Sequence, residues 1–189
     1  NDARETRRAV IALVVLVMLW GYSWITSKIA LFYANPFDVV ALRLELGILT
    51  LFVGMLWTRT SLRPKHWPAL LQIGLIQTGA FLILNTWALS EGGAGKTSVL
   101  VFTMPFWVLV FAWPLLHERI RGLQWICVAL AVVGLVFVLE PWQMRTSLFS
   151  KTLAVLAGMC WAIGVVLAKR LHNREPVDAL SFTFWQMIV

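Results

Sequence analysis

Two neighbouring apolar runs near the start of the chain carry aromatic and ionisable side chains at regular spacing. Trp20, Trp24 and Lys28 are four residues apart in the first run, which places them on one face of a helix. The second run carries Arg43 and Glu45, at about the depth of Lys28 given a rise of ~1.5 Å per residue. Two cations and one anion are therefore expected in a single layer.

This charged layer has two interpretations. Ionisable groups at the centre of a membrane helix cost at least about 2.5 to 3.5 kcal/mol, so they usually pair or line a water-filled cavity. In the structural interpretation, Glu45 pairs with Lys28 or Arg43, and the lysine extends to the nearby interface. In the functional interpretation, one carboxylate cannot neutralise both cations. Arg43 then receives the carboxylate or phosphate of a ligand through a bidentate contact, between apolar walls formed by Trp20 and Trp24.

The next two apolar runs carry further polar residues and a proline. Gln77, Phe81 and Asn85 are four residues apart, so a helix would align them on one stripe. The two amides either form interhelical hydrogen bonds, worth of order 1 kcal/mol each, or line a cavity. Pro105 stands near the middle of the following run and is expected to kink that helix, where it sets a packing angle or acts as a hinge.

The composition is that of a membrane protein. Hydrophobic residues make up 60% of the 189 residues and charged residues 13%, and the mean hydropathy is +0.79; a soluble domain is less apolar and more charged. The net charge of +7 does not indicate nucleic-acid binding, because the basic residues stand between apolar runs. Cys127 and Cys160 lie inside such runs without metal-ligand spacing, so we expect neither a metal nor another cofactor.

Six runs are long enough to span a bilayer, which requires about 20 mostly apolar residues. They cover residues 9–32, 38–58, 68–90, 95–116, 122–140 and 149–169. A seventh run begins near residue 178 and reaches only half a span at Val189, so we expect the chain to be part of a longer polypeptide. The fold class expected here is an all-α transmembrane bundle.

The first and sixth runs share a sequence pattern. Trp20 precedes Lys28 by eight residues, and Trp161 precedes Lys169 by the same number. Pro36 and Asp38 follow the first copy, and Pro176 and Asp178 follow the second. Because five runs separate the two starts, the copies cross the membrane in opposite directions, as in an inverted-repeat transporter. We therefore divide the chain into a five-helix repeat, residues 1–147, and the start of its inverted partner, residues 148–189.

The distribution of basic residues sets the orientation. Eleven of the 16 Lys and Arg fall in alternate connections, while the opposite connections hold Lys96, Arg145 and Lys151. By the positive-inside rule, the N-terminus is cytoplasmic in a multi-pass protein of the bacterial cytoplasmic membrane. The eleven are Arg4, Arg7, Arg8, Arg59, Arg63, Lys65, Arg119, Arg121, Lys169, Arg170 and Arg174.

These motifs together resemble the EamA-type members of the drug/metabolite transporter superfamily. Trp20-Gly21 with Lys28, Pro36 and Arg43 is similar to the opening pattern of that family. The segment from Pro105 to Glu118-Arg119, followed by Gly122 through Gly134, is similar to its fourth and fifth helices. The resemblance implies ten helices in two inverted five-helix repeats, cytoplasmic termini and export of metabolites by alternating access. Among such proteins, the chain looks closest to exporters of amino acids, including aromatic ones.

The second repeat departs from the first at the charged layer. Arg43 and Glu45 correspond to Thr183 and Trp185, so the layer is not mirrored. The second repeat would then contribute mainly Trp161, Trp185 and Gln186 to an asymmetric binding site.

The leading interpretation is a secondary transporter that exports a small metabolite, for which we expect an amino acid. The rest of the second repeat would complete the transport path. Trp20, Trp24 and Trp161 would contact the substrate, Arg43 its carboxylate, and Gln77 and Asn85 its polar groups. ATP is not expected as a partner, because residues 90–97 lack the first glycine and the preceding strand of a P-loop. The alternative is a structural or assembly membrane subunit that transports nothing. An enzyme is disfavoured because no nucleophile, base and orienting group converge.

Overall fold

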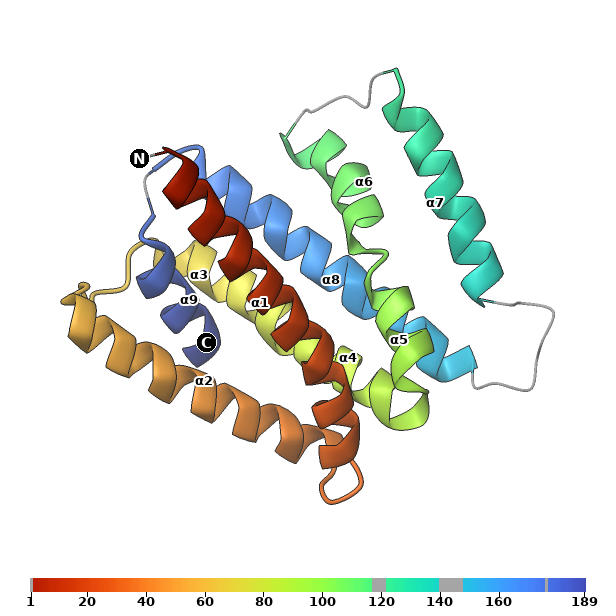
Figure 1. The fold of residues 1–189 in the computed structure, drawn as a ribbon, viewed down its shortest axis with the longest axis horizontal. Coiled ribbons are helices and arrows are strands. Elements are labelled where there is room, and N and C mark those ends of the chain that lie inside the picture. The colour runs from red at the N-terminus through yellow and green to blue at the C-terminus, as the bar shows by residue number, and fades with distance from the viewer. Residues whose placement is uncertain (1, 117–121, 140–147, 176) are drawn as a thin grey trace.

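The described residues of the chain form helices and no strands. The computed structural model describes residues 2–116, 122–139, 148–175 and 177–189 (Figure 1). In chain order the elements are α1 (Asp2–Ala30), α2 (Pro36–Thr58), α3 (Trp67–Ile73), the π-helix η1 (Gly74–Ala80), α4 (Phe81–Glu91), α5 (Ala94–Val101), α6 (Met104–Leu116), α7 (Gln124–Leu139), α8 (Leu148–His172) and α9 (Ala179–Ile188).

Five of the expected spans are present as helices long and apolar enough to cross a membrane. They are Glu5–Ala30, Pro36–Thr58, Trp67–Glu91, Ala94–Leu116 and Leu148–His172. The run expected over residues 122–140 is helical as α7, but its 16 described residues reach only about 24 Å, less than the ~30 Å of a hydrocarbon core. Residue 140, Glu118, Arg119, Arg121, Arg145, Pro176 and the repeat boundary at 147 lie outside the described residues.

Local capping explains where the helices begin and end. The Asn35 side chain accepts hydrogen bonds from the backbone N–H groups of Phe37 and Asp38, both at 3.0 Å, and Pro36 occupies the first turn of α2, where its missing N–H is not needed. Asp178 caps α9 by accepting from the Ser181 N–H at 2.8 Å. The proline and aspartate motif thus lies at a helix start in both copies, but the cap is Asn35 in the first copy and Asp178 itself in the second.

The fourth span is broken near its middle, as predicted from the position of Pro105. α5 ends at Val101 and α6 begins at Met104, with Pro105 in the first turn of α6. Proline cannot donate the hydrogen bond that would continue the helix. In the turn before the proline, the Thr103 hydroxyl donates to the carbonyl oxygen of Leu100 at 2.7 Å. The break leaves Phe102 in the turn between the two half-helices.

Helix α8 lies at the centre of the bundle. It packs against α4, α5, α6 and η1, and Figure 1 shows it with α1 and α3–α4 on one side and α6 on the other. Its buried face carries small residues, among them Ala154, Ala157, Gly158 and Ala162, which allow helices to approach closely in a membrane. A Cβ atom at Gly158 would lie 3.0 Å from the Val101 carbonyl oxygen. The first helix of the proposed second repeat is therefore built into the core of the first.

Two connections meet at the end of the bundle where the N-terminus lies. The α2–α3 and α8–α9 connections are at this end (Figure 1), and His66 Nε2 lies 2.9 Å from Glu175 Oε2 across them. This arrangement agrees with the alternation of basic connections in the sequence.

Candidate functional site

A cavity of about 190 Å³ lies between α1, α2, α4 and α8. This volume corresponds to roughly six water molecules at about 30 Å³ each. Five of the six residues expected to bind a ligand line it, and Gln77 does not. The lining residues are Trp20, Ser23, Trp24, Ser27, Arg43, Phe81, Leu82, Asn85, Leu89 and Trp161.

Aromatic rings form one side of the cavity. The Trp161 ring packs edge-on against Phe81 with 4.9 Å between centroids, and it lies 6.2 Å from the Trp20 ring. Phe102, in the turn that breaks the fourth span, contacts both Trp20 and Trp24 at 6.3 and 6.0 Å. These spacings are typical of favourable tilted and edge-to-face pairs. The cluster joins the first repeat to the first helix of the second.

Two buried polar atoms belong to cavity residues and have no hydrogen-bond partner among the described residues. They are Nε1 of Trp24, a donor, and Oδ1 of Asn85, an acceptor. Asn85 is only 6% exposed. Leaving a buried donor or acceptor unpaired costs about 1 to 3 kcal/mol, so such atoms commonly mark the place of a ligand or an ordered water.

Arg43 brings a positive charge to the same cavity. Its Nη1 atom donates to Oγ of the buried Ser27 at 3.2 Å. No carboxylate of the described residues lies within ion-pair distance of its guanidinium. Arg43, Ser23 and Ser27 also line a second, larger groove of about 580 Å³ between α1 and α2. The arginine therefore lies where the cavity and the groove adjoin.

Lys28 neutralises a helix end and does not pair with Glu45. Its Nζ atom donates to the carbonyl oxygens of Leu89, Ser90 and Gly92 at 2.7, 3.1 and 2.8 Å. The last carbonyls of a helix lack partners and carry the negative end of its dipole, so the end of α4 replaces a carboxylate as the partner of this lysine. The expected pairing of Glu45 with Lys28 or Arg43 is absent among the described residues, and Glu45 is exposed.

Gln77 takes part in a different contact. Its Oε1 atom accepts a hydrogen bond from Nε2 of Gln186 at 3.0 Å, joining the third span to α9. The expected alignment with Asn85 assumed a regular α-helix, but Gln77 lies in the π-helix η1. A π turn holds more residues than an α turn, so four residues no longer return Gln77 to the face of Phe81. No residue pattern in this segment indicates a π-helix.

Pro105 does not line the cavity; it acts on it through the break that presents Phe102. Leu82 and Leu89 line the cavity, and Phe102 packs on its tryptophans without lining it. The sequence did not point to these three residues, because no charge or polarity distinguishes them from other apolar positions. No group of His, Cys, Asp and Glu in the described part of the chain has the arrangement of a metal site.

Comparison with known proteins identifies the family. The EamA-like transporter family matches residues 7–140, well over half of the chain. The chain belongs to this family. The resemblance based on the Trp20, Lys28 and Arg43 pattern is confirmed, and the EamA-family chain is an integral membrane protein of a transporter family rather than an enzyme.

Similar proteins include transporters of several bacteria. The chain is 30% identical over 187 residues to "Uncharacterized transporter YvbV" of Bacillus subtilis, covering 98% of this chain and 60% of that protein. It is 23% identical to "Uncharacterized transporter YoaV" of the same organism, covering 96% of this chain and 63% of that protein. A "Probable amino-acid metabolite efflux pump" of Salmonella typhimurium is 25% identical, with 93% of this chain and 58% of that protein covered. The chain thus spans about three-fifths of the length of these relatives. No solved structure matches.

Proposed function

We propose that this EamA-family protein is a secondary transporter that exports an amino acid across the bacterial cytoplasmic membrane, with its N-terminus inside. The observation that carries the proposal is the chemistry gathered around one cavity: the Arg43 guanidinium, the unpaired Trp24 N–H, the unpaired Asn85 carbonyl and a wall of aromatic rings. An amino acid offers the complementary carboxylate, ammonium and side chain in one small molecule.

Each polar group of the cavity has a partner in this proposal. The carboxylate binds the Arg43 guanidinium in a bidentate, charge-assisted contact and accepts a hydrogen bond from Trp24 Nε1. The substrate ammonium donates to Asn85 Oδ1. The side chain packs against Trp20 and Trp161, whose rings are 6.2 Å apart. Burial of apolar surface against these rings contributes roughly 25 cal/mol per Å².

Two observations support an amino acid over other metabolites. Lys28 is fully engaged by three carbonyl oxygens, so Arg43 is the cation that remains to receive an anionic group in this layer, and one guanidinium suits one carboxylate. In addition, the similar protein of Salmonella typhimurium is named a probable amino-acid metabolite efflux pump.

The mechanism proposed is alternating access by rocking of the two inverted repeats. The cavity is lined by α1, α2 and α4 of the proposed first repeat and by Trp161 of α8, the first helix of the proposed second repeat. Rocking of one repeat against the other would therefore change its wall, with the break at Pro105 as a flexing point in the fourth span. The remainder of the second repeat would complete the path, and ATP is not part of the proposal, because residues 90–97 do not match a P-loop.

Counterflow in proteoliposomes tests the proposal. The protein is reconstituted, with the rest of its second repeat, into vesicles. The vesicles are loaded with an unlabelled amino acid, and the labelled amino acid is added outside. We expect uptake above that of empty vesicles for aromatic or aliphatic amino acids, and its loss in Arg43→Gln. A folded protein without counterflow for any amino acid, or Arg43→Gln and Asn85→Ala variants that only lower stability, would favour the structural-subunit alternative.

A further inference from the structure

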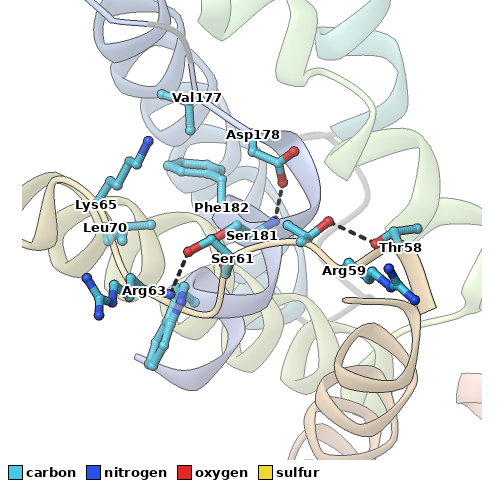
Figure 2. Close-up of a pocket in the computed structure, with 12 residues that line it drawn as sticks. Thr58, Arg59, Ser61, Arg63, Lys65, Leu70, Val177, Asp178, Ser181 and Phe182 are labelled. Carbon is cyan, nitrogen blue, oxygen red and sulfur yellow. Dashed lines mark hydrogen bonds between the residues drawn. The ribbon is translucent and has the colours of Figure 1, made fainter. Parts of the chain in front are cut away.

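A second cavity, of about 380 Å³, lies at the end of the bundle where the N-terminus is found. It is enclosed by the α2–α3 connection and the start of α9 (Figure 2) and shares no residue with the aromatic cavity. Its lining includes Arg59, Arg63, Lys65 and the hydroxyl residues Ser61 and Ser181. Three cations thus line a hollow that the transport proposal does not use, and Figure 2 shows the charged ends of Arg59 and Arg63 on opposite sides of it.

The basic residues belong to a connection that is held in place. Arg59 adopts the left-handed conformation that ends α2, with its N–H directed to the carbonyls of Leu56 and Met55. The Arg63 N–H donates to Oγ of Ser61 at 3.3 Å. At the end of the connection, His66 Nε2 lies 2.9 Å from Glu175 Oε2. These contacts fix the backbone of the connection, while the side chains of Arg59, Arg63 and Lys65 are exposed and can turn toward a ligand.

Helix α9 supplies the opposite wall. Asp178 is engaged in capping its N-terminus through the Ser181 N–H, and the Ser181 hydroxyl donates to the Ser61 carbonyl oxygen at 3.3 Å. Figure 2 shows Ser181 beside Ser61, with the Asp178 carboxylate directed to the Ser181 N–H at the start of α9. The lining also includes Trp185, whose Nε1 is buried without a partner among the described residues. Because Asp178 already occupies the N-terminus of α9, the free donor on this wall is the Trp185 N–H, which can donate to an anion.

An apolar hollow adjoins this basic cavity. It has a volume of about 200 Å³, is lined by apolar side chains of α8 and α9 with His172, and shares Val177 and Phe182 with the basic cavity. Charged and apolar compartments in contact at a bundle end match the two parts of a phospholipid, a headgroup and the first segment of an acyl chain.

We infer that the cavity formed by Arg59, Arg63 and Lys65 binds a phosphate group, supplied by the headgroup of an anionic phospholipid. Guanidinium groups bind phosphate oxygens in bidentate pairs, and basic pockets at the cytoplasmic face of membrane helices bind anionic headgroups. The placement in the cytoplasmic leaflet rests on the proposed orientation, while the phosphate chemistry does not. Because the site joins the α2–α3 connection to α9, a bound phosphate stabilises their contact by binding to this arrangement.

The test compares two triple variants with the same change of charge. The cavity variant is Arg59→Gln, Arg63→Gln and Lys65→Gln. The matched control is Arg8→Gln, Arg170→Gln and Arg174→Gln, three exposed residues that do not line the cavity. Binding is measured by native mass spectrometry and by thermal unfolding of the protein in phosphatidylcholine nanodiscs with increasing phosphatidylglycerol. We expect phosphatidylglycerol affinity to fall by about tenfold or more in the cavity variant, with little change in the control.

A separate arm identifies the source of the phosphate. Inorganic phosphate is titrated against the protein in detergent, with chloride at the same ionic strength as control. Competition that requires millimolar phosphate, together with tight phosphatidylglycerol binding, supports the lipid; tight binding of free phosphate and none of the lipid overturns the lipid assignment. Equal losses in both triple variants would mean diffuse charge attraction and overturn the site. If the cavity variant does not fold, the single Lys65→Gln and Arg170→Gln variants give the same comparison.

Discussion

Arg43 of α2 donates a hydrogen bond to the hydroxyl oxygen of Ser27 in α1 at 3.2 Å, and no carboxylate of the described residues accompanies it. An arginine between two spans, tied to a neutral hydroxyl, keeps most of its hydrogen-bonding capacity. The neighbouring Lys28 is satisfied by a helix end. This difference between two cations of one layer is the basis for assigning ligand binding to the arginine and a structural role to the lysine.

Replacement of Lys28 by methionine should destabilise the protein. The change leaves the carbonyls of Leu89, Ser90 and Gly92 without their donor, at a cost of about 1 to 3 kcal/mol. The thermal unfolding midpoint in detergent should fall, while the matched Arg7→Met variant at the exposed start of α1 should unfold like the parent protein. An unchanged midpoint with reduced ligand affinity would instead make Lys28 a ligand.

Removal of the Trp24 N–H should weaken binding without changing the shape of the wall. Trp24→Phe keeps an aromatic ring beside Phe102 but deletes the donor that has no protein partner. Affinity for an amino acid should fall by about three- to tenfold, as expected for a net hydrogen bond of roughly 0.5 to 1.5 kcal/mol. The control is Trp57→Phe, at a tryptophan that is 87% exposed. Equal effects of the two variants in a binding assay would remove Trp24 from the site.

The Gln77–Gln186 hydrogen bond should couple η1 to α9 energetically. In a double-mutant cycle with Gln77→Leu and Gln186→Leu, the coupling should be about 0.6 kcal/mol, the usual size for interhelical hydrogen bonds in membranes. Thermal or denaturant unfolding in detergent provides the four stabilities. Amino-acid affinity should stay the same throughout, because Gln77 does not line the aromatic cavity. Additive stabilities, with a loss of affinity in Gln77→Leu, would return this residue to the binding site.

Gly164 should tolerate no side chain. A Cβ atom there would overlap the Gln77 side chain, so Gly164→Ala should cost about 1 to 3 kcal/mol of stability. Gly54→Ala in α2 is the matched control, since nothing lies within 4 Å of its Cβ position; there the higher helix propensity of alanine should leave stability unchanged or raise it by up to ~1 kcal/mol. Similar unfolding midpoints for both variants would contradict the close packing of α8 on η1.

The grouping of Trp20, Trp24 and Arg43 around one cavity could be predicted because α1 and α2 are regular helices, in which sequence spacing determines the face. Trp161 could be placed with them because the repeat pattern relates it to Trp20. Gln77 could not be placed correctly, since a π turn changes the relation between spacing and face.

The partner of Lys28 could not be predicted either. Its carbonyl acceptors are 61 to 64 residues away in the sequence, and only the tertiary packing of α1 against the end of α4 brings them together. The position of Phe102 could not be predicted for a related reason: its contacts with Trp20 and Trp24 depend on where the fourth span breaks. Regular helices preserve information about faces, whereas contacts between distant segments depend on the whole bundle.

The most direct test of the proposed binding site compares an amino acid with its decarboxylated amine. Affinities for phenylalanine and phenylethylamine are measured on the parent protein and on Arg43→Gln by scintillation proximity or calorimetry. We predict that the parent protein binds phenylalanine more tightly than phenylethylamine. In Arg43→Gln the ratio of the two affinities should fall by about ten- to hundredfold, the effect of losing a charge-assisted hydrogen bond. The affinity for phenylethylamine should not change. Equal weakening of both ligands, or an unchanged preference, would show that Arg43 does not bind the substrate carboxylate.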